Sequence, residues 1–208
     1  MGVSRKFKTG GARIRSVGRM NTIHRHLASC AAEAARVTRG LTPEQLAGPS
    51  VCADWTVREL ANHLVLYSAH GLEHRALRTE LPAETVARDF TADADWPEQY
   101  AAQLDRALAA WGKPEAWEGE VDMGGSPVPA AEMAAMLLLE LALHGWDLAR
   151  STGREFEVPE ETGECVREVV ERYAEMYRQY DGFDEPAGEV AADAPAFTRA
   201  VALSGRRP

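Results

Sequence analysis

The sequence lacks a long hydrophobic run, and this absence excludes two classes of protein. No apolar block reaches the roughly 18 residues of a membrane span, because Glu140 interrupts the longest block, Met133 to Leu143. The basic first nineteen residues are not followed by an apolar stretch that could serve as a signal peptide. We therefore expect neither a membrane segment nor export.

Cysteine is also scarce. Cys30, Cys52 and Cys165 are odd in number and widely spaced. Such a pattern fits reduced thiols inside a cell better than a set of structural disulfides. We predict a cytoplasmic location.

Charge is divided unevenly along the chain. The net charge is -9, yet residues 1–19 hold basic side chains and no acidic ones, which leaves an excess of acid in residues 20–208. Such a body should repel nucleic acid. We interpret residues 1–19 as a basic, disordered leader, with a nucleic-acid-binding arm as the alternative, and Met20 is a candidate for the natural start. Residues 20–208 are predicted to form a single domain.

Helical periodicity dominates that domain. It predicts helices over residues 21–39, from 56 to near 82, over 96–112, 130–151 and 159–180, and a docked last turn around 197–203. Thr56 and Glu59 form a capping box, Gly71 is a weak point, and Gly153 ends the fourth helix. Residues 113–129 should form a loop with at most a short extended pair. The fold class is therefore all-α: an antiparallel four-helix bundle with an additional C-terminal helix and long loops.

An acid and an imidazole interrupt the most apolar helix. Glu140 and His144 are four residues apart, so they lie on one face. A buried carboxylate without a partner costs on the order of several kcal/mol. A metal ion bound by both side chains would remove this cost, as would an ion pair with a protonated histidine or an arginine from another helix.

A third candidate ligand lies in the second helix. His63 follows Leu60 at helical spacing and should face inward. His70 and His74 form a rival pair, although Gly71 and the charged residues beside them favour exposure. His24 and His26 are expected at the surface.

Three segments resemble a known family. They are CADWTVRELANHLV (residues 52–65), ELALHGWDLARSTGR (140–154) and the closing FTRAVALSGRRP. All three are similar to segments of the mycothiol-dependent maleylpyruvate isomerase N-terminal family, and the closing segment to that of its short, single-domain members within the DinB-like superfamily. The resemblance covers roughly residues 20–208.

This resemblance implies a DinB-like four-helix bundle that holds a divalent metal, usually zinc, through His63, Glu140 and His144. It also implies mycothiol as a small-thiol cosubstrate. The isomerases of that family carry a further C-terminal domain, for which this chain leaves no room, and this argues against maleylpyruvate as the substrate.

Such a site suggests thiol chemistry. Three protein ligands would leave a coordination position open, as in catalytic zinc sites. A thiol bound there would ionise and attack a small electrophile, giving S-transfer or isomerisation. The alternatives are a hydrolase that activates water and a non-catalytic metal-binding partner or regulatory module, in which a fourth ligand such as Asp147 or His70 closes the site. Monomer and homodimer both remain open.

Further residues surround this site. Asp147 is predicted to orient a ligand or move protons, with a salt bridge to Arg150 or another helix as the alternative. Arg58 and Asn62 could hold acidic groups of a bound cofactor or substrate. The remaining candidates are predicted to serve packing rather than chemistry: Trp55, Trp146 and Cys52.

Overall fold

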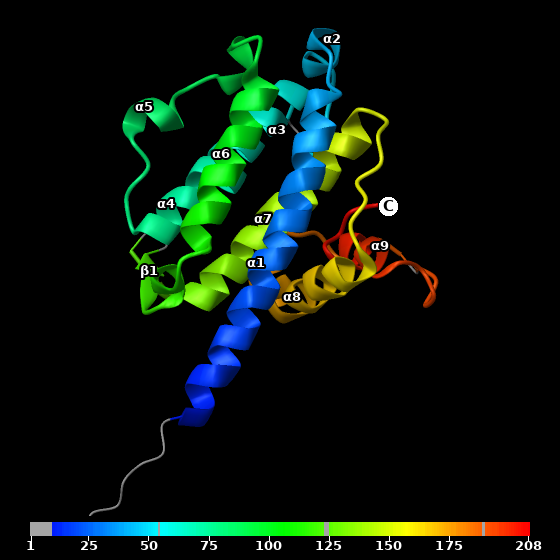
Figure 1. The fold of residues 1–208 in the computed structure, drawn as a ribbon. Coiled ribbons are helices and arrows are strands. Elements are labelled where there is room, and N and C mark those ends of the chain that lie inside the picture. The colour runs from blue at the N-terminus through cyan, green and yellow to red at the C-terminus, as the bar shows by residue number, and fades with distance from the viewer. Residues whose placement is uncertain (1–9, 54, 123–124, 189) are drawn as a thin grey trace, which may run out of the picture.

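A bundle of long helices forms the centre of the molecule, and two further helices lie against one side of it (Figure 1). The computed structural model describes residues 10–53, 55–122, 125–188 and 190–208, with the backbone alone for residues 10–21. Its helices are α1 (Gly10–Arg39), α2 (Pro43–Leu46), α3 (Val57–Leu64), the π-helix η1 (Val65–Gly71), α4 (Leu72–Leu77), α5 (Ala83–Val86), the 3-10 helix η2 (Phe90–Ala92), α6 (Trp96–Trp111), the 3-10 helix η3 (Pro114–Trp117), α7 (Ala130–Ser151), α8 (Glu160–Gln179) and α9 (Ala196–Leu203).

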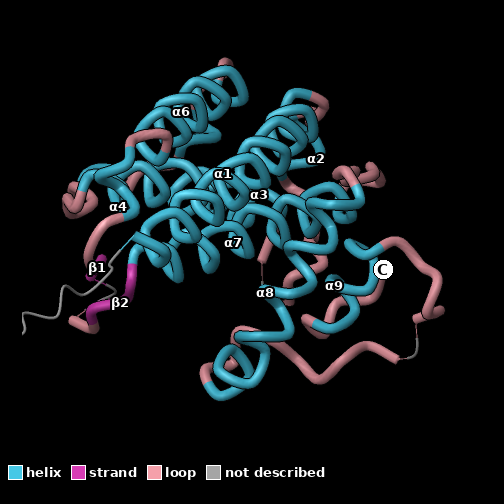
Figure 2. The backbone as a smooth tube through the Cα atoms, turned by 60° about the horizontal axis from the view of Figure 1, so that its bottom comes forward, coloured by secondary structure: helices cyan, strands magenta, loops and turns pink. Residues whose placement is uncertain are grey.

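Four columns of helix surround one core. In chain order they are α1, then α3 with η1 and α4, then α6, and then α7. Helix α1 packs against α6 and α7, α3 packs against α7, and α4 packs against α6. Each column contributes fully or almost fully buried leucines, among them Leu27, Leu60, Leu104 and Leu138. Helix α8 packs on α9 and also contacts α1 and α7, which places this pair beside the bundle (Figure 2). The predicted all-α bundle with an additional C-terminal helix is confirmed.

The second column is one continuous helix with a widened middle. Thr56 caps α3, since its hydroxyl oxygen accepts from the amide of Glu59 and the Glu59 carboxylate accepts from the amide of Thr56. The column passes through η1 into α4 and ends at Arg78, whose φ is 58°. The helix predicted to reach Pro82 is therefore shorter. A π-helical segment often marks a functional position, and this one begins two residues after His63.

The first helix differs from prediction at two points. Its backbone is helical from Gly10, well before Asn21, whereas residues 1–9 of the expected leader lie outside the described part of the chain. His26 was expected at the surface, and this was wrong: its side chain is buried and its Nδ1 lies 3.0 Å from Oγ1 of Thr162 in α8. The packing of α8 on α1 covers this position. Burial by a distant helix cannot be predicted from the spacing of apolar residues within α1.

The fourth column begins at a hairpin. Strand β1 (Glu120–Asp122) pairs antiparallel with β2 (Pro127–Pro129), with Val121 opposite Val128. This is the short extended pair allowed by the sequence. The next helix, α7, has the predicted bounds, and Gly153 follows its end with a φ of +69°.

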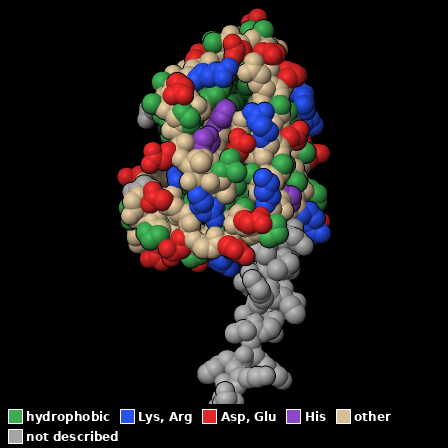
Figure 3. All heavy atoms as spheres, turned by 60° about the vertical axis from the view of Figure 1, so that its left-hand side comes forward, with side chains coloured by type: hydrophobic (Ala, Val, Ile, Leu, Met, Phe, Trp, Pro, Cys, Tyr) green, Lys and Arg blue, Asp and Glu red, His purple; other side chains and the backbone are tan. Residues whose placement is uncertain are grey.

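The tail docks as expected, because α9 buries Phe197 and Val201. All three cysteines are free thiols. None of the helices in the described ranges is long and apolar enough to cross a membrane. Figure 3 shows acidic and basic side chains interspersed over the face that carries α4 and α6, with histidine side chains reaching the surface between them.

Candidate metal centre

The packing of α3 on α7 brings three predicted ligands together. His63 lies in the last turn of α3, and Glu140 and His144 lie one turn apart on α7. Nε2 of His63 is 2.9 Å from Oε1 of Glu140, and Nε2 of His144 is 3.8 Å from Oε2. One candidate ligand atom from each residue lies within 4.8 Å of the other two. The three side chains therefore converge on one point.

Two atoms of this cluster lack a hydrogen bond. Nε2 of His63 and Oε1 of Glu140 are both buried, and neither has a hydrogen-bond partner among the described residues although they are 2.9 Å apart. Unpaired buried polar atoms cost about 1–3 kcal/mol each. A divalent cation between them would remove this cost. The donor set of two imidazole nitrogens and a carboxylate oxygen is one used by catalytic zinc.

Opposite charges on neighbouring side chains stabilise the charged forms of Glu140 and His144. Burial opposes ionisation of Glu140, yet the charge of His144 and the contact with His63 outweigh it and hold the pKa of Glu140 below its usual value. Burial also opposes protonation of His144, but Glu140 and Asp147 outweigh it and raise the pKa of His144. The site therefore favours an ionised carboxylate, which is the form that binds a cation.

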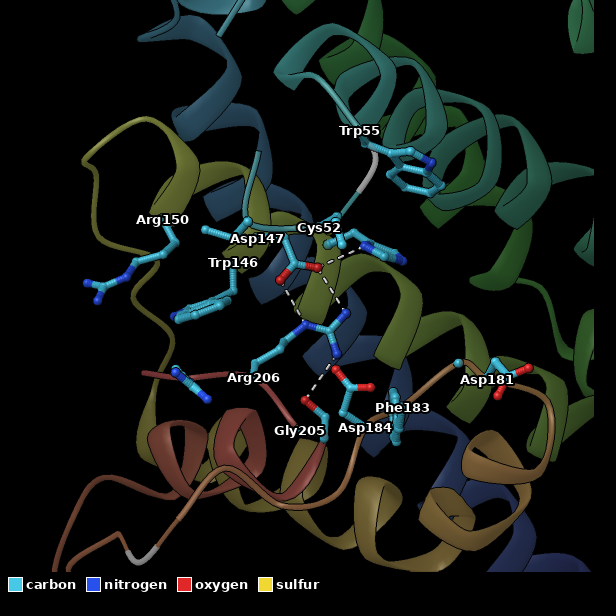
Figure 4. Close-up of a pocket in the computed structure, with 16 residues that line it drawn as sticks. Cys52, Trp55, Trp146, Asp147, Arg150, Asp181, Phe183, Asp184, Gly205 and Arg206 are labelled. Atoms are coloured by element: carbon cyan, nitrogen blue, oxygen red, sulfur yellow. Dashed lines mark hydrogen bonds and ion pairs between the residues drawn. The ribbon is translucent and has the colours of Figure 1, made fainter. Parts of the chain in front are cut away.

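Asp147 fixes the orientation of His144. The Nδ1–H of His144 donates to Oδ2 of Asp147 at 2.9 Å, which directs the other ring nitrogen toward Glu140. Arg206 donates to both Asp147 oxygens, from Nε at 2.8 Å and from Nη2 at 2.9 Å (Figure 4). The buried aspartate is thus paired with a residue from the end of the chain and not with Arg150.

Arg206 is a site residue that the sequence reasoning missed. Its position depends on Gly205, whose φ is +88° and whose absent Cβ would lie 2.6 Å from Cβ of Asp184. The guanidinium also lies over the Phe183 ring, 5.8 Å from its centroid. Two signals could have pointed to it: Gly205 directly before it, and its place in the closing segment FTRAVALSGRRP that resembles the family.

Two cavities adjoin the triad. The tryptophan cavity, about 770 Å³, is lined by His144 and by Cys52, Trp55, Trp146, Asp184 and Arg206, among others. The methionine cavity, about 930 Å³, is lined by His63 and Glu140 and by Tyr67, Arg75, Met136 and Tyr177, among others. The three candidate ligands are thus divided between two spaces, each large enough for a small molecule.

Aromatic rings enclose the histidines. The centroid of the Trp55 ring lies 4.7 Å from that of His63 and 6.1 Å from that of His144, and the Tyr67 centroid lies 4.7 Å from that of His63. Trp55 and Trp146 both pack partly against the core, as predicted, but they also line the tryptophan cavity. Their remaining surface is available to a ligand.

Cys52 lies beside the same histidine. Together with His144 and Asp147 it forms a second group with ligand-like spacing. Burial and the nearby Asp147 raise the pKa of the Cys52 thiol to about 12. A thiol that remains protonated at neutral pH is a poor nucleophile, which supports the packing interpretation. Because Arg206 already occupies both Asp147 oxygens, we favour the triad over this second group.

Arg58 and Asn62 lie away from both cavities. Arg58 contacts Asp89 and Thr91, and Asn62 donates to Asp89 and accepts from the amide of Phe90. These bonds hold the turn containing η2 against α3. The cofactor-binding role predicted for the two residues has no support in these contacts.

His70 and His74, the rival histidine pair, also make contacts outside the triad. His70 stacks on Phe90 with ring centroids 5.1 Å apart, and Nδ1 of His74 lies 2.8 Å from Oγ1 of Thr79. Among the described residues, no fourth histidine, cysteine or acidic side chain joins the triad. A cation held by these three residues alone would have a coordination position open.

Comparisons with known proteins show a family and a similar fold. A family described as "Mycothiol maleylpyruvate isomerase N-terminal domain" matches residues 27–149, a range that contains all three candidate ligands. A solved structure titled "Crystal structure of the mycothiol-dependent maleylpyruvate isomerase" is similar with a TM-score of 0.53 and 18% identity, covering 76% of this chain and 72% of that one. Among curated proteins, none matches significantly. The structural match supports the all-α bundle fold.

Proposed function

Because this chain belongs to the mycothiol maleylpyruvate isomerase N-terminal domain family, we propose that it is a divalent-metal-dependent enzyme acting on small molecules. It would use a small thiol, mycothiol, in S-transfer to, or isomerisation of, a small electrophile. The observation that carries the proposal is that buried Nε2 of His63 and Oε1 of Glu140 lie 2.9 Å apart without a hydrogen bond, at a point bordered by two cavities.

The candidate ligands and their neighbours have different roles in the proposed site. His63, Glu140 and His144 would hold a divalent cation, zinc in the simplest case. A cation bound there supplies Lewis acidity, which lowers the pKa of a thiol in the open position. Trp55 would shield part of both histidine rings from water, and Tyr67 would shield part of the His63 ring.

Asp147 acts as a positioning residue. Its side chain is 2% exposed, and its two oxygens accept from His144 and Arg206. Burial opposes its ionisation, but the contacts with His144 and Arg206 outweigh it and lower the pKa of Asp147. It therefore remains ionised and holds the His144 ring, and we assign it to orientation rather than to proton transfer.

Metal analysis of the purified protein tests the proposal. We expect one zinc per chain in the wild type and a large loss in His63→Ala, Glu140→Gln and His144→Ala. His74→Ala is the matched control, because this partly buried histidine on the same column lies outside the triad. Equal metal content in the triad variants and the control would refute the proposal.

Thiol dependence is tested separately on the zinc-loaded protein. Mycothiol should raise the melting temperature and should be consumed when an electrophile is added. Metal binding without any response to mycothiol would favour the hydrolase or the metal-binding module instead. Those two differ in turn, since only a hydrolase would turn over ester or amide substrates.

A further inference from the structure

We propose that a third cavity, formed where η1 packs against α6 and the turn at η2, binds a single phosphate group. This arginine cavity, lined by Arg88, Arg106 and His70 among others, has a volume of about 80 Å³. It shares no lining residue with the tryptophan and methionine cavities. Phosphate binding at this place requires neither a metal ion nor a thiol, so it goes beyond the proposed function and does not depend on it.

The charge of the lining distinguishes the arginine cavity from the other two. Among the described residues, no acidic side chain lines it, although the protein carries a net charge of -9. Both other cavities include several acids, among them Asp181 and Asp184 in one and Glu80 and Glu120 in the other. An anion would meet repelling carboxylates there, whereas in the arginine cavity it would meet cationic side chains.

Helix α6 forms one wall through regular spacing. Gln99, Gln103 and Arg106 follow one another by four and three residues, so they share one face of the helix. Arg106 donates to the side-chain oxygen of Gln103, and it forms no ion pair with a described residue. The amide nitrogen of Gln103 donates to Glu73 at 2.6 Å. The nearby acid therefore contacts the glutamine, and the Arg106 guanidinium can pair with a ligand.

The second arginine precedes η2. Arg88 donates through Nη2 to Asp93 at 2.6 Å and to the side-chain oxygen of Gln99 at 3.2 Å. Its guanidinium carbon lies 5.3 Å from the centroid of the Phe90 ring. Its Nε and Nη1 form no hydrogen bond with a described residue. These two nitrogens can donate to a phosphate oxygen while the pair with Asp93 remains.

The π-helical geometry of η1 brings His70 to the same cavity. Seven residues make nearly two turns of a regular α-helix, so His70 would then lie on the same face as His63. The wider turn of η1, which begins at Val65, rotates the residues that follow. His70 consequently stacks on Phe90 and lines the arginine cavity instead of joining the triad. Its imidazole is a third group that can donate to an oxyanion.

The size and the walls of the cavity suit one small group. Its volume is well below the roughly 300 Å³ at which sites for drug-sized ligands begin. Phe90 and Trp96 form apolar walls and are 5% and 6% exposed. Such walls limit screening by water, which strengthens the attraction between guanidinium and phosphate. The two arginines and the histidine come from three parts of the chain, so each can contact a different phosphate oxygen.

Calorimetric titration of the purified protein with inorganic phosphate tests the site. We expect a dissociation constant of about 1 mM or lower at low ionic strength, and Arg106→Gln should weaken binding by at least about tenfold. Arg106 is exposed, and thermal melts would verify that the variant is folded. Arg75→Gln is the matched control, because Arg75 lines the methionine cavity and also forms no ion pair with a described residue. This control should stay within about twofold of the wild type.

The proposal is overturned if the wild type shows no saturable binding, or if Arg106→Gln binds phosphate as the wild type does. The second result would place the phosphate elsewhere, for example on a metal ion at the triad. Glycerol phosphate as a second probe distinguishes the source of the group. Affinity equal to that of inorganic phosphate or higher would identify a phosphomonoester as the ligand, and lower affinity would identify the free ion. In both cases Arg106→Gln must weaken the binding.

The ionisation of His70 provides a second readout. Burial lowers the pKa of His70, and the charges of Arg106, His74 and Arg88 lower it further, which outweighs the opposing effect of Glu73. A phosphate bound beside the ring adds negative charge, so the pKa of His70 should rise when phosphate is added.

NMR titration of the imidazole resonances over pH measures this rise, with the His70 signal assigned by its loss in His70→Gln. His24 is the control, because its ring contacts the carbonyl of Leu108 and does not line the cavity. Its resonance should not respond to phosphate. An unchanged pKa of His70 at saturating phosphate would overturn the assignment to this cavity.

Discussion

At the residue scale, the site is organised around one carboxylate. Glu140 lies on a helix whose neighbouring side chains are almost all buried and apolar. A lone ionised carboxylate is costly in such surroundings, so two histidines and a nearby arginine are needed to stabilise it. The sequence alone predicted that Glu140 needs a stabilising partner, because this acid lies within an otherwise apolar helical stretch.

The orientation of His144 gives the first prediction. Asp147→Asn removes the carboxylate that fixes the histidine ring, and we expect zinc affinity to fall by about 10–100-fold. Competition with a chromogenic chelator measures this. Arg150→Gln is the control, since Arg150 was the alternative partner but does not contact Asp147. Unchanged affinity in Asp147→Asn would show that His144 is held by other contacts.

At the element scale, two helical glycines should respond to alanine in opposite ways. A Cβ at Gly71, in η1, would meet the Leu66 carbonyl oxygen at 3.4 Å, an ordinary contact, whereas at Gly145, in α7, it would lie 2.5 Å from the Phe156 ring. Gly71→Ala should therefore stabilise by about 0.5–1 kcal/mol. Gly145→Ala should destabilise by about 1–3 kcal/mol. Urea unfolding measures both, and equal effects would contradict the packing of Phe156 on α7.

A single acid ties α1 to the segment between α7 and α8. Glu33 accepts hydrogen bonds from Arg36 and from the amide of Glu157. Burial opposes its ionisation, but these bonds outweigh it and lower the pKa of Glu33. Because the folded pKa is lower than the unfolded value of about 4.3, this stability is present above that value and is lost as the pH falls through the folded pKa.

Glu33→Gln tests this linkage. The difference in unfolding free energy between wild type and variant should be largest near pH 7 and should shrink on acidification below about pH 4. Urea titrations across the pH range measure it. Glu161→Gln is the control, because its ion pair with Arg25 is exposed and should contribute little. A difference that does not vary with pH would assign the effect of Glu33 to packing.

At the scale of the whole molecule, a bound cation would join two columns of the bundle. The proposed ligands come from α3 and α7, which are far apart in the chain and adjacent in space. Zinc at about 100 times its dissociation constant should therefore stabilise the fold by about 2.7 kcal/mol. A thermal melt with and without chelator would measure this as a higher melting temperature. His63→Ala should melt at the same temperature in both conditions, and a zinc response that survives in this variant would place the ion elsewhere.

The sequence could predict the features that depend on local pattern. The bounds of α7 follow from its apolar periodicity and from Gly153, and the start of α3 follows from the capping box at Thr56. His63, Glu140 and His144 could be proposed together because helical spacing placed each on an inward face. Cytoplasmic location, a separate leader and the choice between monomer and homodimer remain predictions.

Other features arose from contacts between distant segments. His26 is buried because α8 covers it, and Arg58 and Asn62 are engaged because the η2 turn folds back onto α3. Neither event alters the periodicity of the helices concerned. The π-helical geometry of η1 also follows from no sequence signal that we identified.

The amino-acid sequence by itself determined which segments are helical and which side chains those helices turn inward, because both depend on spacing along one element. The tertiary structure decided that Arg206 reaches Asp147 and that two cavities flank the triad. These depend on how α9 and the chain end pack beside α7, and such packing is set by shape and burial across the whole molecule, where local spacing carries no information.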